Sequence, residues 1–134
     1  MRFLAVLLCA ATMAACTKDA LNSPTGPVNV QLVLAPGDTS EVGNTGLRLR
    51  FQGVSGDSRC PGDALCIQGG DAIVRVDVLQ KGGGQRTIEL HTGSMQPVLD
   101  GDFTIALEAL TPYPFSSLPP IAPANYRATL RVTR

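Results

Sequence analysis

The sequence LRLRFQGVSGDSRCPGDALCIQGGDAIVRVDVLQ, residues 47–80, decides the fold of this chain. Apolar and polar residues alternate over residues 47–54 and again over residues 72–80, as they do in half-buried β-strands. Between these two runs, residues 57–71 show no such alternation and are rich in aspartate and glycine. The stretch therefore predicts two strands joined by a long loop.

The same period-two pattern recurs along the rest of the chain after residue 28. It places Arg75, Asp77 and His91 on solvent-facing sides of their strands. We predict about seven strands, over residues 28–34, 39–42, 47–54, 72–80, 85–92, 103–109 and 126–132. Two packed sheets bury so many one-sided strands most economically, so we expect an all-β fold. The expected form is a small antiparallel β-sandwich of immunoglobulin-like general shape, with a closed barrel as the alternative.

Residues 112–123 contain five prolines. Neither a helix nor a central strand accommodates that density of proline, because each proline lacks a backbone N–H group. We therefore expect an extended surface connection before the last strand.

The first residues have the features of a lipoprotein signal peptide. Arg2 supplies a positive charge, an apolar run follows, and Met13-Ala14-Ala15-Cys16 resembles the bacterial lipobox. This interpretation makes residues 1–15 a signal peptide and Cys16 the site of lipidation. The alternative is an ordinary signal peptide that is cleaved near the alanines, with Cys16 incidental.

Residues 16–29 have too little apolar content to fold alone and are interpreted as the lipidated cysteine and a flexible tether. Residues 30–134 then form the sandwich domain. The expected location is the bacterial cell envelope, with the membrane reached through the lipid anchor. The residue after Cys16 is Thr17. An aspartate at this position would resemble the signal that retains lipoproteins in the inner membrane, so threonine favours the outer membrane in a diderm organism.

Charge excludes one class of partner. The whole chain has 11 basic and 11 acidic residues, so its net charge is zero. That balance provides no electrostatic basis for binding nucleic acid, which depends on clustered cations.

Cys60 and Cys66 are the two cysteines left for a disulfide, since Cys9 lies in the signal peptide and Cys16 takes lipid. An exported protein meets an oxidising compartment, so we expect the pair to be bonded, with Pro61-Gly62 forming the turn. The loop has few apolar residues, namely Ala64, Leu65 and Ile67, to hold it against the sandwich, so we expect the disulfide to pin it. One alternative is a redox-active cysteine pair, although the spacing is not C-x-x-C. Another is a zinc site, which would have only three ligands, the two cysteines and His91.

Three carboxylates of the same loop, Asp57, Asp63 and Asp71, could offer oxygen ligands to calcium, although their spacing does not match an EF-hand. The simpler interpretation makes them turn and strand-end residues, with Asp57 accepting backbone hydrogen bonds or pairing with Arg59. His91 is the one histidine, and no serine has a nucleophile-elbow context, so we expect no enzyme.

Several short motifs resemble a family of uncharacterised bacterial exported proteins and lipoproteins. They are Phe51-x-x-Val54, Asp57-Ser58-Arg59-Cys60-Pro61, Cys66-Ile67, Gly70-x-Ala72-x-Val74, Leu110-x-Pro112-x-Pro114 and Tyr126-Arg127-Ala128. Gln68-Gly69 replaces the Trp-Ala of the family pattern, so any role of that aromatic residue is lost here. The resemblance implies export and does not assign an activity.

Together these features predict a membrane-anchored lipoprotein without a cofactor, acting as a non-catalytic binding or structural module of the envelope with a protein partner. The alternative is a calcium-binding or redox accessory protein built on residues 57–71.

Overall fold

The structure is a computed structural model that describes residues 26–134. The signal peptide at residues 1–15, Cys16 and most of the tether lie outside the described residues. The described chain forms eight strands and one single-turn 3-10 helix. They are β1 (Asn29–Leu34), β2 (Thr39–Glu41), β3 (Arg48–Asp57), β4 (Ala72–Leu79), β5 (Gln85–His91), β6 (Val98–Asp100), β7 (Phe103–Thr111), η2 (Pro123–Asn125) and β8 (Arg127–Thr133).

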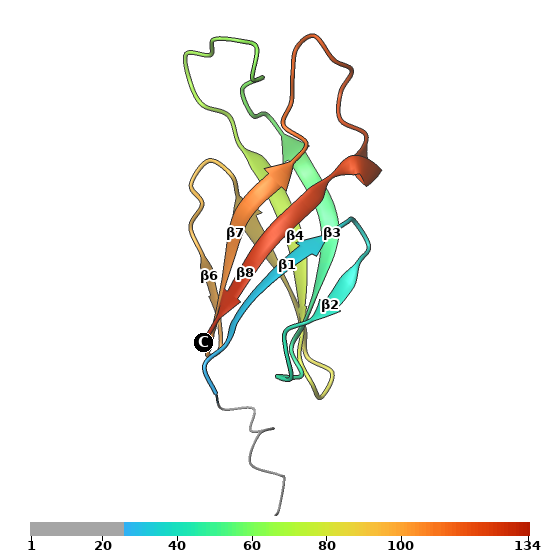
Figure 1. Cartoon of the computed structure of the whole chain (residues 1–134), viewed down its shortest axis with the longest axis vertical. Coiled ribbons are helices and arrows are strands. Elements are labelled where there is room, and N and C mark those ends of the chain that lie inside the picture. Colours follow the sequence, from blue (N-terminus) through green and yellow to red (C-terminus); the bar gives the residue numbers. More distant parts are fainter. Residues whose placement is uncertain (1–25) are drawn as a thin grey trace, which may run out of the picture.

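The strands form two four-stranded antiparallel sheets, with the orders β1-β8-β7-β6 and β2-β3-β4-β5. The two sheets pack face to face, which confirms the predicted small β-sandwich (Figure 1). The prediction of about seven strands missed β6, a strand of three residues.

An aliphatic core fills the space between the sheets. Phe51 is its largest fully buried side chain, and it is surrounded by valines, leucines and isoleucines from both sheets. Leu49, Phe51, Val74, Val76 and Val78 face inward, as the alternation predicts. The core therefore forms where the period-two pattern places it.

Two predicted side-chain positions are corrected by the structure. Asp77 lies on the outer face of β4 but is only 1 % exposed, because neighbours on β3 and β5 cover it. Gln52 Nε2 and Thr87 Oγ1 each donate a hydrogen bond of 2.7 Å to Asp77 Oδ1. On β7, the alternation of Phe103, Ile105 and Leu107 predicts that Ala109 faces inward as well. A register shift between Leu107 and Ala109 moves the buried position to Leu110 instead.

Two register shifts in β3, between Phe51 and Gly53 and between Val54 and Gly56, let the strand run on to Asp57. Asp57 therefore pairs with Ala72, and the loop leaves the sandwich at its very end. Residues 58–71 and residues 112–126, here called the apical loops, extend from this end. The chain enters β1 and leaves β8 at the opposite end (Figure 1).

Candidate functional site: the apical loops

A disulfide closes the tip of the first apical loop. Cys60 and Cys66 are bonded with their Cα atoms 6.0 Å apart, which confirms the predicted pairing. Ala64 N donates to Pro61 O at 3.1 Å, so Gly62 and Asp63 are the central residues of a turn inside the ring. The seven-residue ring is therefore a compact unit rather than a loose excursion.

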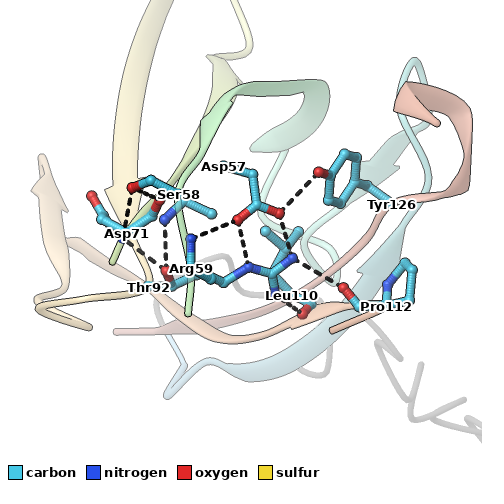
Figure 2. A network of polar contacts seen from close by, with 9 residues as sticks. Asp57, Ser58, Arg59, Asp71, Thr92, Leu110, Pro112 and Tyr126 are labelled. Carbon is cyan, nitrogen blue, oxygen red and sulfur yellow. Dashed lines mark hydrogen bonds and ion pairs between the residues drawn. The ribbon is translucent and has the colours of Figure 1, made fainter. Parts of the chain in front are cut away.

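The side chain of Arg59, the residue before this ring, joins the two apical loops (Figure 2). Its Nε and Nη2 donate to the two carboxylate oxygens of Asp57 at 2.9 and 2.6 Å. Its Nη1 donates to Leu110 O at 2.8 Å, and its Nη2 also donates to Pro112 O at 3.0 Å. Arg59 is only 7 % exposed, and its guanidinium lies 5.2 Å from the ring centre of Tyr113.

Asp57 is the acceptor at the centre of this network. Besides the guanidinium, Tyr126 Oη donates to Asp57 Oδ2 at 2.9 Å, and Arg59 N donates to Asp57 Oδ1 at 3.2 Å. Burial raises the pKa of Asp57, but the hydrogen bonds from Arg59 and Tyr126 outweigh burial and hold that pKa below its usual value. Burial and the nearby Asp57 raise the pKa of Tyr126. The ion pair therefore stays charged and hydrogen-bonded near neutral pH.

The ring also binds the second apical loop directly. Gly62 N donates to Pro114 O at 2.9 Å. Asp63 accepts backbone hydrogen bonds from Ser116 N at 2.6 Å and Ser117 N at 3.0 Å. These bonds, that from Ser116 above all, hold the pKa of the Asp63 carboxyl well below its usual range. A Cβ on Gly62 would lie 3.0 Å from the ring of Phe115, so the two loops meet at close range.

A third contact fixes the return of the first loop into β4. Asp71 Oδ2 lies 2.5 Å from His91 Nδ1, and Asp71 Oδ1 accepts from Gly93 N at 2.8 Å and from Thr92 Oγ1 at 3.2 Å. Ser58 N donates to Asp71 O at 2.7 Å (Figure 2). Burial raises the pKa of Asp71, but the hydrogen bonds from His91, Gly93 and Thr92 outweigh it and lower that pKa.

These contacts decide the outcome for the residues singled out in the sequence. Asp57 does pair with Arg59, as predicted. Asp57, Asp63 and Asp71 are bound to three different sets of partners, and residues 26–134 contain no cluster of three acidic, histidine or cysteine ligands. His91 is not simply solvated but holds Asp71. The sequence pattern missed Tyr126, Leu110 O and Pro112 O, because partners more than fifty residues away leave no local signal.

Several large apolar side chains of the apical loops are exposed. Leu65 and Ile67 are each 104 % exposed, so they do not hold the loop against the sandwich. Polar contacts and the disulfide do so instead. Tyr113, Phe115 and Leu118 on the second apical loop are also exposed, and this proline-rich loop encloses a shallow groove of about 300 Å³. We call Leu65, Ile67, Tyr113, Phe115 and Leu118 the apical surface.

No family model, no curated protein and no solved structure matches this chain. Within residues 26–134, no helix has the length and hydrophobicity needed to cross a membrane.

Proposed function

We propose that this chain is a lipid-anchored, non-catalytic binding module of the bacterial cell envelope, which presents its apical surface to a protein partner. The observation that carries the proposal is the full exposure of Leu65 and Ile67 at the tip of a disulfide-closed, hydrogen-bonded loop. Single exposed apolar side chains are common on protein surfaces, but apolar residues gathered on two adjoining loops are typical of interaction sites.

The way in which the loops are held supports binding rather than a passive role. Ordering a flexible loop upon binding costs free energy, and a loop that is ordered beforehand avoids that cost. Here the guanidinium of Arg59, the carboxylate of Asp63 and the Cys60–Cys66 bond all join or close the apical loops. Such a number of restraints on a solvent-exposed tip is expected where the tip must keep one shape.

The position of the loops is compatible with a lipid anchor at Cys16. The described chain begins next to β1, at the end of the sandwich opposite the apical loops (Figure 1). A lipid anchor on a tether at that end leaves the apical surface free. Acyl chains hold a protein on a membrane at about 0.8 kcal/mol per buried methylene.

The anchor is tested by the Cys16→Ser variant. We expect the variant to be released from the membrane fraction or to remain unprocessed, because no sulfur is present to be acylated. Mature-sized Cys16→Ser protein that still fractionates with the membrane, as the parent does, would show that the anchor is assigned wrongly.

The binding surface is tested by a photo-crosslinking residue placed at Leu65 in cells. Leu99 on β6, 71 % exposed and outside the apical loops, is the matched control position. We expect a discrete protein adduct from position 65 and none of the same mass from position 99, and we expect Ile67→Ser to weaken the adduct. Identical adduct patterns from both positions, or no adduct from position 65, would contradict the proposed function.

A further inference from the structure

The four edges of the described sheets differ in how they are protected. β2 and β6 are three residues long, and β5 carries Arg86, Glu89 and His91. β1 has six residues, Asn-Val-Gln-Leu-Val-Leu, without a charge or a proline. Short length, charged side chains and proline are the means by which proteins block pairing at a sheet edge, and β1 has none of them.

The backbone of β1 leaves one row of hydrogen-bonding groups open. Val28 and Arg134 exchange both backbone hydrogen bonds, Val28 N to Arg134 O at 3.2 Å and Arg134 N to Val28 O at 3.0 Å. Because bonding positions alternate in an antiparallel pair, the N–H and C=O groups of Asn29, Gln31 and Val33 face away from β8. Among residues 26–134, no strand pairs with that side of β1, which forms the outer edge of its sheet (Figure 1).

The side chains of β1 are also incompletely covered. Val33 on the outer face is 62 % exposed. Val30 and Leu32 face the core but are only partly buried, because β8 lies on one side of β1 and no strand lies on the other. An added strand would cover all three side chains and satisfy the open backbone groups.

We propose that β1 pairs antiparallel with β1 of a second copy of this chain, about a two-fold axis at Gln31. In this register Gln31 lies opposite Gln31 of the second copy, Asn29 lies opposite Val33, and Val30 lies opposite Leu32. The two β1-β8-β7-β6 sheets become one continuous sheet of eight strands.

A second copy suits this edge because the strand is complementary to itself. Every position of the proposed register matches an uncharged side chain with another uncharged side chain, so no like charges oppose each other. On the outer face, Gln31 Nε2 donates to Glu108 Oε2 at 2.5 Å, and the oxygen of the same amide remains an acceptor for a partner. The charge of Glu108 is offset by its ion pair with Arg131.

The proposed contact is small, since it joins two strands of six residues, and interfaces of this size are weak. Confinement of both copies on one membrane would raise their effective concentration and favour the pair.

The tether is long enough to allow this. The longest strand, β3, has ten residues and extends about 33 Å, which sets the length that a tether must span. Residues 17–28 can extend to at most about 40 Å. Both tethers could therefore reach one membrane although they start at opposite ends of the dimer. The apical surfaces lie outside the interface, so each can bind its own partner.

The first test is a charge exchange at the proposed axis in the full chain. Two differently tagged copies are expressed together, cross-linked in intact cells with formaldehyde and recovered by one tag. We expect Gln31→Lys in both copies, or Gln31→Glu in both copies, to lower recovery of the second tag about fivefold. Gln31→Lys in one copy with Gln31→Glu in the other should restore it. Glu89→Lys on the β5 edge is the control and should change nothing.

The register is tested by single cysteines and a short thiol cross-linker. Gln31→Cys should give a dimer, and Glu89→Cys should not. Asn29→Cys should cross-link to a copy with Val33→Cys rather than to itself, because Asn29 and Asn29 of the second copy would be offset by four residues, about 13 Å.

The proposal is wrong if the tagged copies are not recovered together in the parent, or if the three charge combinations recover the second tag equally. A dimer that cross-links through Asn29→Cys with itself would rule out the axis at Gln31. None of these results bears on the apical surface, which is tested separately at Leu65.

Discussion

The sandwich body and the apical loops are stabilised in opposite ways. In the body, the buried side chains are almost all apolar, with Phe51 and the surrounding aliphatic residues at the centre and Asp77 and Asp100 as the charged exceptions. In the apical loops, a charged side chain, Arg59, is buried, and two large aliphatic side chains, Leu65 and Ile67, are fully exposed. The body follows the usual balance of apolar burial, whereas the loops depend on hydrogen bonds, one ion pair and one disulfide.

This difference shows which region is arranged for stability and which for contact. A protein gains nothing in stability from exposed leucine and isoleucine, so a structure that holds them in solvent needs another source of order. The apical loops obtain this order from polar groups that form hydrogen bonds with each other. No buried side-chain nitrogen or oxygen atom among the described residues lacks a hydrogen-bond partner. The order of the loops is therefore separable from the order of the core, and substitutions should distinguish the two.

The largest effect is expected in the core. Phe51→Ala should lower the free energy of unfolding by about 3–5 kcal/mol, because it removes a large buried side chain and leaves a cavity. The midpoint of a urea titration followed by far-ultraviolet circular dichroism measures the change. Body and apical loops should lose structure together in this variant, since the loops have no core of their own.

Arg59→Ala should cost about 3 kcal/mol, the low end for breaking a buried ion pair, because Tyr126 still donates to Asp57. Its effect should be concentrated in the loops, where Leu110 O and Pro112 O lose their donor. Hydrogen exchange of residues 58–71 and 112–126 should speed up more than exchange of the strands. The control is Arg75→Ala, whose exposed pair with Glu89 at 3.6 Å should contribute at most about 1 kcal/mol.

These two predictions also mark how far sequence reasoning reaches. The alternation of residues such as Leu49 and Val76 predicts the sandwich, because one local rule of period two decides which side chain is buried. The disulfide follows from cysteine number and export, and the Asp57–Arg59 pair follows from two neighbouring residues.

The remaining contacts of the apical loops could not be predicted from local patterns. Arg59 reaches carbonyl groups 51 and 53 residues away, and Asp63 binds amides 53 and 54 residues away. Backbone carbonyl and amide groups occur at every residue, so they have no signature in sequence. The outward direction of Leu65 and Ile67 has no signal in the sequence either: apolar character alone predicts burial, and only the folded loop shows otherwise.

Replacing both Cys60 and Cys66 with serine should lower the free energy of unfolding by about 2 kcal/mol, as the chain entropy of a seven-residue ring implies. The fold should remain, because the core does not involve the ring. Thermal melting of the oxidised parent and the double variant measures the loss, with the reduced parent as the control. A variant that fails to form the sandwich would show that loops and body are not separable.

The smallest effect concerns pH. The pKa of Asp63 is lowered by its hydrogen bonds with the backbone N–H groups of Ser116 and Ser117, so this contact stabilises the folded state above the ordinary pKa of aspartate, about 3.9. The stabilisation is retained at neutral pH and is lost as pH falls from about 4 toward the lower folded pKa. Amide chemical shifts of Ser116 and Ser117 should move in this acid range, and Asp63→Asn should abolish the movement.

Amide nitrogen-15 relaxation tests the central claim most directly, because the claim is that the apical loops hold one shape while presenting Leu65 and Ile67 to solvent. We predict order parameters for residues 60–67 and 113–118 near those of the strands, about 0.85. The same residues should become more mobile in Arg59→Ala. Order parameters below about 0.6 in the oxidised parent would describe flexible loops and would contradict the account.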